Sequence, residues 1–239
     1  MRKVKFIDGE YYHIYNRGVD KRDVFLDEGD YLRFLTSLKD FNNDSTSRTR
    51  DYILRKNQAR VKELKELSSR YRELSSFNPS ESSEFSSVIA SLPNLVDIIC
   101  YCFNPNHFHL ILKQLADKGI GKFMHKLGSG YTNFFNIKYK RSGSLFQGSF
   151  KAVKIVSHEH LLWVSAYVNA NAQIHGLIKD AVNYKWCSYP EYLGESAENF
   201  CHKDIIAKQF KDKEQFKGFM NDCIITMKEK KELQKYLID

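Results

Sequence analysis

Hydrophobic positions alternate in some stretches of the chain and recur at helical spacing in others. Residues 11–18 alternate and are rich in β-forming side chains until Gly18, which predicts a strand. Residues 27–43 have the period of an amphipathic helix, and Asp27 or Asp30 is available as its cap. The apolar positions of this helix are Tyr31, Phe34, Leu35 and Leu38. The chain therefore opens with a strand and a helix.

The pattern resumes after residue 94. Residues 95–103 and 107–113 are β-rich runs joined by the Asn-Pro-Asn segment 104–106, which predicts an antiparallel pair with a turn. Three further elements are expected, namely a helix over 119–140, a strand or hairpin over 143–155, and a helix from Ser157 to about Gln173. This order of elements indicates an α+β fold with a mainly antiparallel sheet.

Two segments fall outside this pattern. Residues 44–94 combine a charged, helix-favouring stretch with a Ser-rich stretch, which predicts an insertion, partly helical and partly loop. Residues 195–239 are Lys-rich with helical spacing, which predicts a helical C-terminal extension. We therefore expect a catalytic domain over 1–194, interrupted at about 44–94, and an extension over 195–239.

Composition limits the class of protein. Hydrophobic residues make up 42% and aromatic residues 14% of the 239 residues, which excludes a disordered chain. No apolar run is long enough to span a bilayer, no signal-type stretch follows Met1, and five cysteines without a C-x-x-C pair suggest reduced thiols. We expect a cytoplasmic protein. The net charge of +8 favours a polyanionic partner, most often nucleic acid.

Two short patterns suggest chemistry. His107 and His109 flank one apolar residue on a predicted strand, so their imidazoles share one face and can converge on a metal ion. Tyr167 and Asn171 are four apart on a predicted helix, so the phenol and the amide point the same way. Taken singly, the first pair also suits a half-exposed strand face, and the second a core tyrosine beside a surface asparagine.

Five stretches in order resemble one family, the single-tyrosine HUH transposases, in particular the REP-associated tyrosine transposases and their insertion-sequence relatives. The resemblance covers about residues 11–193 without the Ser-rich insertion. The stretches are 105–112 (PNHFHLIL), 131–136 (YTNFFN), 143–150 (GSLFQGSF), 167–171 (YVNAN) and 186–189 (WCSY). Family members commonly have Asn-Pro where this chain has Asn171-Ala172, a change that we expect to extend the helix and keep the amide.

The resemblance implies a fold, an activity and a set of residues. The fold is a ferredoxin-like antiparallel sheet with helices on one side. The activity is that of a metal-dependent endonuclease and strand transferase acting on single-stranded or hairpin DNA, in which Tyr167 attacks to form a 5′-phosphotyrosyl intermediate and a free 3′-hydroxyl. The metal ligands are His107, His109 and Asn171, and the ion is Mg²⁺ or Mn²⁺, although this donor set also suits Zn²⁺. No nucleotide cofactor is required, because the covalent intermediate keeps the bond energy for rejoining.

Other residues compete for these roles. Tyr131 is the second candidate nucleophile, but it has no ligand-type side chain four residues later. His13 could line the site, touch DNA or be structural, and we interpret His158 and His160 as cap-region residues. Residues 138–154 mix cationic and aromatic side chains, so we expect them to contact phosphates and stack on bases, together with the first strand. The expected DNA contacts are Arg17, Lys138, Lys140, Arg141, Lys151 and Lys154.

Alternative functions remain open at this stage. A domesticated protein on the same fold would bind a DNA hairpin without cutting it, and a metal hydrolase would use the histidine pair without needing Tyr167. Insertion-sequence relatives act as dimers and repeat-associated relatives need not, so both a monomer and a homodimer stay open. The resemblance implies a cytoplasmic bacterial protein that acts at the nucleoid.

Overall fold

The computed structural model describes residues 4–43 and 93–236. The chain divides into two compact units, one formed by Met1–Asn42 with Leu95–Asp239 and the other by Asn43–Asn94. The helices and strands described below belong to the first unit. The predicted insertion, with its helical stretch, lies almost wholly outside the described residues, and the boundary at 194/195 stays a prediction.

The first strand and helix are where the sequence predicts them. Strand β1 spans Tyr11–Arg17, and every second side chain, beginning with Tyr12, is buried. Helix α1 spans Glu28–Asp40 and begins with a capping box, in which the Asp27 side chain accepts from the backbone of Asp30 while Asp30 accepts from the backbone of Asp27. A short 3-10 turn, η1, lies between them at Val19–Lys21.

Strands β2 (Val96–Asn104) and β3 (His107–Gln114) form the predicted antiparallel hairpin. The register shifts between Ile98 and Cys100, which is the position of a β-bulge and changes which residues of β2 face each side of the sheet. The strand also extends one residue further than predicted, through Asn104, so the connecting turn consists of residues 105–106 alone. Asn104 is therefore a strand residue paired with His107.

Helix α4 spans Gly119–Lys138 and strand β4 spans Lys151–Lys154. The strand or hairpin predicted over 143–155 is thus mostly loop, apart from a single bridge between Gly18 and Phe146. The reason is local, because Gly143 and Gly148 both have positive φ, which interrupts an extended strand.

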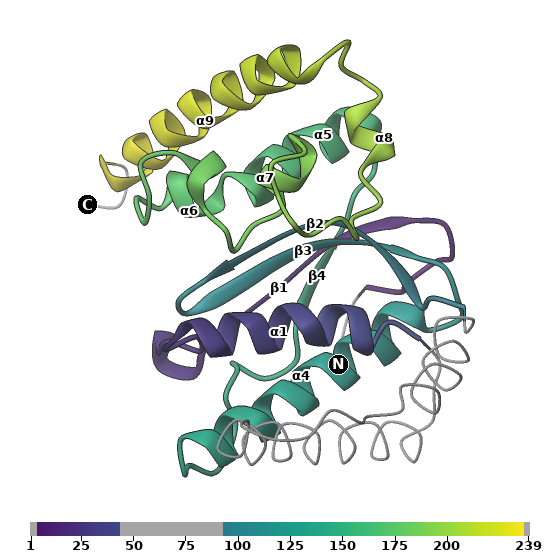
Figure 1. Cartoon of the computed structure of the whole chain (residues 1–239), viewed down its shortest axis with the longest axis vertical. Coiled ribbons are helices and arrows are strands. Elements are labelled where there is room, and N and C mark those ends of the chain that lie inside the picture. The colour runs from purple at the N-terminus through teal and green to yellow at the C-terminus, as the bar shows by residue number, and fades with distance from the viewer. Residues whose placement is uncertain (1–3, 44–92, 237–239) are drawn as a thin grey trace, which may run out of the picture. The chain divides into compact units, whose positions relative to one another are not determined.

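The four strands make one antiparallel sheet in the order β2-β3-β1-β4. With α1 and α4 as the connecting helices, this is the ferredoxin-like arrangement, and the predicted fold class is confirmed. Figure 1 shows α1 and α4 packed on one face of the sheet.

The opposite face of the sheet is covered by a second layer of helices, whereas the resemblance led us to expect helices on one side (Figure 1). Helix α5 spans His158–Asn169 and begins at the predicted cap, where the Ser157 side chain accepts from the backbone N–H of His160 at 3.1 Å. The remaining elements are α6 (Asn171–Ile174), η2 (Ala181–Asn183), α7 (Tyr189–Tyr192), α8 (Asp204–Ala207) and α9 (Lys213–Tyr236).

Each face of the sheet therefore has its own hydrophobic core. The first core lies between the sheet and helices α1 and α4 and is rich in aromatic rings, including Phe34, Phe103 and Tyr131. The second core lies under α5 to α9 and contains smaller side chains, such as Cys100 and Ala166. All five cysteines are buried and free of disulfides.

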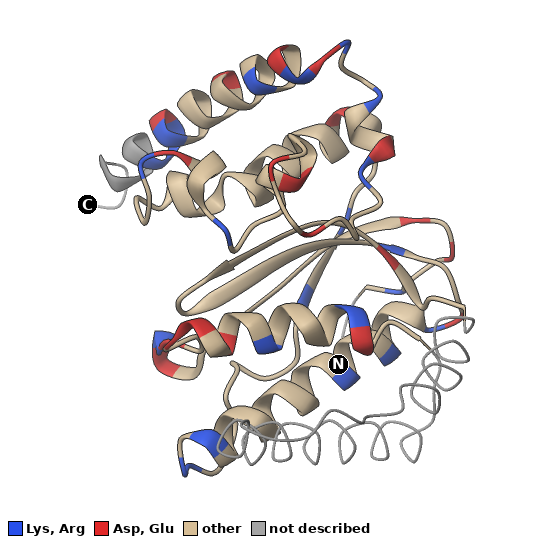
Figure 2. Cartoon of the chain, in the orientation of Figure 1, with Lys and Arg blue, Asp and Glu red and all other residues tan. Residues whose placement is uncertain are grey.

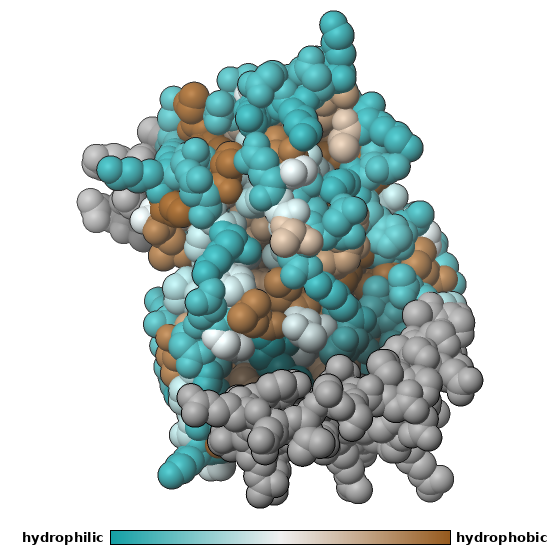
Figure 3. All heavy atoms as spheres, viewed as in Figure 1, coloured by the Kyte–Doolittle hydropathy of each residue, from teal (hydrophilic) through white to brown (hydrophobic). Residues whose placement is uncertain are grey.

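Charges of both signs are interspersed along α1 and α9, whereas the charged residues of α4 are all lysines (Figure 2). Hydrophobic side chains on the face seen in Figure 3 are interspersed among hydrophilic ones. In the described ranges no helix combines the length and the apolar character that a membrane span requires.

Candidate functional site

The alternation of strand residues places both histidines of the H-x-H pair on one face of the sheet. Phe108, between them, is buried in the first core, while His107 and His109 face the helices α5 and α6. Across the sheet, His109 pairs with Tyr15 and His107 pairs with Arg17 of β1. The imidazole rings of the two histidines are 5.1 Å apart at their centroids and nearly perpendicular.

Tyr167 and Asn171 reach the same place from the helical layer. The Tyr167 ring lies edge-on to that of His109, with 5.5 Å between the centroids. The Asn171 side-chain oxygen, Oδ1, lies 3.3 Å from Nε2 of His107. The four residues predicted to carry the chemistry are therefore brought together, from β3, α5 and α6.

The helix that holds Tyr167 and Asn171 is not continuous, contrary to expectation. It is interrupted at Ala170, which separates α5 from α6. Backbone hydrogen bonds from Ala170 to Ala166 and from Ile174 to Ala170 cross the interruption, so the helical path is kept. Asn169 and Asn171, on either side of the break, are both fully buried, and their side-chain oxygens accept from Ser188 and Asn104, respectively.

The Nδ1 atom of each imidazole has a polar partner that fixes the orientation of the ring. Nδ1 of His107 lies 2.6 Å from the Asn106 side-chain oxygen, which can only accept, so Nδ1 carries the proton and Nε2 is left with a lone pair. Nδ1 of His109 lies 2.9 Å from Nε2 of His13. A histidine that binds a metal usually has its other nitrogen bonded in this way. His13 is therefore a neighbour of the candidate site.

Burial keeps these imidazoles neutral. Desolvation lowers the pKa of His107 to about 4 and, together with the charge of His160, that of His13 to about 4. Desolvation also lowers the pKa of His109 well below its usual range. At neutral pH all three rings are neutral and each has one nitrogen with a lone pair, the form in which imidazole binds a metal ion.

Burial has the opposite effect on the phenol. Desolvation raises the pKa of Tyr167 above its ordinary value, and a hydrogen bond with Asn171 offsets this only in part. The Tyr167 side chain is therefore a protonated phenol at neutral pH unless positive charge is brought next to it.

A cavity of about 320 Å³ opens onto this cluster. Within the described part of the chain, none of the side chains that line it is acidic, and Arg17 and Lys151 contribute positive charge. Lys151 also lies 5.9 Å from the centre of the Tyr15 ring. The lining consists of Tyr15, Asn16, Arg17, His107, His109, Gln147, Lys151, Tyr167 and His175. A cavity of this charge suits a phosphate group.

The other predicted DNA contacts lie elsewhere. Lys154 pairs in register with Tyr12, so it points to the opposite face of the sheet from Lys151, and it forms an ion pair with Glu10 at 3.4 Å. Lys140 is exposed just after α4 and has positive φ. The Arg141 guanidinium, in the loop after α4, donates to Asn136 in the last turn of that helix at 3.0 Å. The structure brings Arg17 and Lys151 to the cavity, and not these three.

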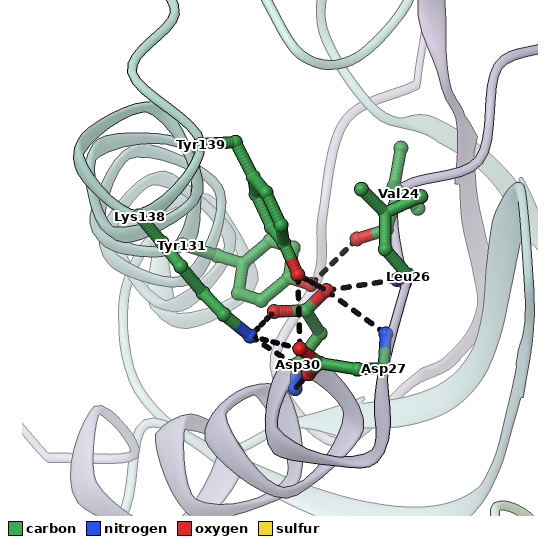
Figure 4. A network of polar contacts seen from close by, with 7 residues as sticks. All are labelled: Val24, Leu26, Asp27, Asp30, Tyr131, Lys138 and Tyr139. Carbon is green, nitrogen blue, oxygen red and sulfur yellow. Dashed lines mark hydrogen bonds and ion pairs between the residues drawn. The ribbon is translucent and has the colours of Figure 1, made fainter.

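Lys138 belongs to a polar network at the start of α1. Its Nζ lies 2.7 Å from carboxylate oxygens of both Asp27 and Asp30, and the Tyr139 hydroxyl donates to Asp30 at 2.8 Å (Figure 4). Desolvation lowers the pKa of Lys138, but the hydrogen bonds to Asp27 and Asp30 outweigh it and the pKa is raised. This lysine joins α4 to the start of α1.

The competing tyrosine is excluded from the site by its position. Tyr131 is fully buried in the first core, and its hydroxyl donates to the Val24 carbonyl at 2.6 Å (Figure 4). Burial, above all, raises its pKa far above the ordinary range. Tyr167, by contrast, lines the cavity next to the histidines.

The donor atoms that meet here fit a small divalent cation. In the ranges 4–43 and 93–236 no group of three or more His, Cys, Asp or Glu side chains is placed to hold a metal, so amide oxygens would have to complete any site. Two ligand atoms about 2.1 Å from one cation and at right angles are about 3 Å apart, close to the observed 3.3 Å between His107 Nε2 and Asn171 Oδ1. Asn171 Nδ2 is buried without a partner, so the oxygen is the only end of this amide that is bonded.

Sequence reasoning missed two neighbours of this cluster. Asn104 is fully buried, and its amide nitrogen bonds to Asn171 and lies 2.9 Å from His107 Nε2. A hairpin turn of two residues would have placed it directly across from His107, which was the available signal. His175, after α6, lies 5.7 Å from His107 between ring centroids and contacts Lys231 of α9 at 3.2 Å. Nothing local in the sequence indicates that contact.

The comparison with protein-family models agrees with the resemblance seen in the sequence. The family model described as "Transposase IS200 like" matches residues 69–171, a range that includes His107, His109, Tyr167 and Asn171. A solved structure described as "Structure of the REP associates tyrosine transposase bound to a REP hairpin" is similar with a TM-score of 0.48 and 12% identity, over 81% of this chain and 85% of that chain. No curated protein matched.

Proposed function

Since the chain resembles the IS200-like transposases over residues 69–171, we propose that it is a divalent-cation-dependent enzyme that cuts and rejoins single-stranded DNA through Tyr167. The observation that supports this most directly is the meeting of four side chains from three elements. The Tyr167 ring lies next to His109, while His107 Nε2 and Asn171 Oδ1 lie 3.3 Å apart. A tyrosine with a purely structural role would not need these neutral metal-ligand atoms around it.

The proposed cation is held by His107, His109 and Asn171 and is Mg²⁺ or Mn²⁺. The two imidazoles are neutral because burial lowers their pKa values, and Asn171 offers an oxygen. A divalent cation in this position supplies positive charge beside the scissile phosphate and the attacking phenol. Asn106 and His13 hold the two ring orientations through the Nδ1 atoms.

The phosphate to be cut is placed in the cavity by Arg17 and Lys151. Both side chains line the cavity, and acidic side chains are absent from that lining in the described part of the chain. Positive charge at such a position attracts the phosphodiester backbone whatever its sequence. Tyr15, on the same strand face as His109, offers a ring on which an unpaired base can stack.

The reaction conserves the number of bonds. The Tyr167 oxygen forms a bond to phosphorus, the phenolic proton is lost, and the bond from phosphorus to the 3′-oxygen of the neighbouring nucleotide breaks. The products are a 5′-phosphotyrosyl linkage and a strand that ends in a 3′-hydroxyl after that oxygen takes up a proton. Attack by another 3′-hydroxyl reverses these steps and releases Tyr167, so no nucleotide cofactor is needed.

The test is the formation of a covalent adduct. The full chain is incubated with a library of single-stranded DNA hairpins and Mg²⁺ or Mn²⁺, and protein–DNA adducts are scored on a denaturing gel for the wild type and Tyr167→Phe. We expect an adduct that requires the cation and is absent in the variant. Binding without an adduct, with both cations and the whole library, would support a hairpin-binding protein that does not cut. Cleavage that persists in Tyr167→Phe would support a metal hydrolase.

A further inference from the structure

The amide of Asn104 occupies a place at which a cation ligand is expected. Asn104 is the last residue of β2, is fully buried and pairs in register with His107. Its Nδ2 lies 2.9 Å from His107 Nε2 and donates to Asn171 Oδ1. Both of those acceptor atoms are proposed cation ligands, and the same amide group contacts both.

This arrangement changes when a cation is bound. The lone pairs on His107 Nε2 and Asn171 Oδ1 cannot accept hydrogen bonds from Asn104 while they are directed at a cation. An amide N–H group pointing at a cation is also repelled by it. Rotation of the amide by about 180° replaces Nδ2 by Oδ1, which is nearly the same size and has lone pairs to offer.

Two of the three distances among these atoms suit that exchange, and the third, from Asn104 Nδ2 to Asn171 Oδ1, is shorter at 2.5 Å. Ligand atoms at right angles on a small divalent cation are about 3 Å apart. The Asn104 amide position is 2.9 Å from His107 Nε2, and His107 Nε2 is 3.3 Å from Asn171 Oδ1. An oxygen at this position would therefore complete a cluster of adjacent ligands.

The far side of the amide accommodates either orientation. Cys102 Sγ donates to the Asn104 oxygen at 3.6 Å. A thiol is both a weak donor and a weak acceptor, so it can accept from the amide nitrogen after rotation.

We propose that Asn104 is a further protein ligand of the cation and that its side-chain amide rotates by about 180° when the cation binds. This inference rests on the proposed cation site. In the cation-free protein the nitrogen of this amide satisfies the ligand atoms. In the cation-bound protein the oxygen joins them. Asn104 thereby exchanges a hydrogen-bond donor for a ligand without movement of the strand.

The test measures Mn²⁺ affinity of the full chain without DNA, from the free-ion signal in electron paramagnetic resonance. The variants are Asn104→Leu, which removes both donor and ligand, and Asn104→Asp, which adds a charged oxygen. Asn133→Leu on the exposed side of α4 is the matched control. We expect about tenfold weaker binding in Asn104→Leu, tighter binding in Asn104→Asp, and no change in the control.

The sign of the Asn104→Leu effect decides between the alternatives. If Asn104 were only a donor that competes with the cation, the leucine variant would bind Mn²⁺ as tightly as the wild type or more tightly, which would overturn the inference alone. Failure of the wild type to bind Mn²⁺ would overturn the proposed cation site as well. Thermal unfolding midpoints verify that each variant is folded.

A second measurement does not depend on the leucine variant. In a ¹⁵N-labelled wild type, the Asn104 side-chain NH₂ resonances are assigned by their absence in Asn104→Asp. Addition of Mg²⁺ is expected to shift them, because both hydrogen-bond acceptors of Nδ2 are exchanged for the Cys102 sulfur. Unchanged Asn104 resonances in a protein whose other site resonances respond to Mg²⁺ would overturn the inference.

Discussion

The two faces of the sheet are built from the same strands and use them differently. On the face toward α1 and α4, Phe108 and its neighbours form an aromatic core, and the Asp30–Lys138–Tyr139 network beside it is fully paired. On the face toward α5 and α6, His107 and His109 lie near the buried Asn171, whose Nδ2 has no partner. One residue step along β3 separates a stabilising position from a reactive one.

This difference indicates how the protein combines stability with chemistry. A buried polar group without a partner costs free energy, and a folded chain tolerates it where another region compensates. Here the first core supplies that compensation, because its rings are large, fully buried and in contact with one another. The second face can then keep neutral imidazoles and an incompletely bonded amide next to a cavity.

The largest expected effect comes from neighbouring substitutions on β3. Phe108→Ala removes a ring that is 2% exposed and should lower the free energy of unfolding by about 3–5 kcal/mol. His107→Ala should leave stability within about 1 kcal/mol of the wild type and abolish cation-dependent adduct formation. Urea unfolding and the adduct gel measure the two quantities. A loss of stability in His107→Ala as large as that in Phe108→Ala would contradict the contrast between the faces.

The same substitution in two tyrosines gives a smaller effect on stability. Tyr131→Phe removes a buried hydrogen bond to the Val24 carbonyl and leaves that oxygen unpaired, which should cost about 1–2 kcal/mol. It should not prevent adduct formation, since Tyr131 is on the far face. Tyr167→Phe should show the reverse pattern. Adduct loss in Tyr131→Phe under conditions in which the variant is fully folded would count against the assignment of the nucleophile.

Two lysines predicted from the sequence to contact DNA now differ in surroundings. Lys151 lines the cavity, whereas Lys138 is bonded to two carboxylates. Lys151→Gln should weaken single-stranded DNA binding a few-fold and reduce the salt dependence by about 0.7 in log–log slope, as expected for one lost phosphate contact. Lys138→Gln should change the slope less and instead lower stability. Fluorescence anisotropy at several salt concentrations measures the slopes, and equal reductions would refute the distinction.

The smallest expected effect is a pH dependence of the free energy of unfolding, which arises from the Asp27–Lys138 pair on the side of α1 and α4. The hydrogen bond with Lys138, above all, lowers the pKa of Asp27 below its usual value of 3.8. The unfolded chain therefore binds the proton more readily than the folded one, so this contribution to stability is present above about pH 4 and is lost as the pH falls through the lower folded value.

Lys138→Met is the corresponding variant. Because it lacks the ammonium group, its stability should depend less on pH below about 4 than that of the wild type. Urea midpoints between about pH 2.5 and 6 measure both curves. Parallel curves would show that the Asp27–Lys138 pair contributes nothing to the acid sensitivity of the protein. Many exposed ion pairs make no measurable contribution to stability.

Much of the architecture could be predicted from the sequence because it is encoded locally. The spacing of apolar residues predicts α1 and α4, alternation predicts β1, and two β-rich runs joined by a turn predict β2 and β3. The fold class followed from the order of these elements. The segment 143–150 was harder, since its aromatic residues favour a strand while two glycines with positive φ prevent one.

The residues of the candidate site likewise fall into those that local sequence patterns predict and those that they do not. Strand alternation alone places His107 and His109 on one face, and helical spacing places Asn171 near Tyr167. Asn104 and His175 could not be assigned to the site in this way, because their neighbours are distant in the chain or lie across a turn of unknown length. Lys138 was interpreted as a DNA contact because the sequence does not show that Asp27 and Asp30 lie beside it.

The sequence by itself determined the period of each element, the shared face of the histidine pair and the resemblance to a family of transposases. The tertiary structure alone decided which groups meet, such as His13 with His109 and Asn104 with Asn171. Local patterns follow from backbone geometry within a few residues, whereas these contacts depend on strand register and on how the helices pack over the sheet.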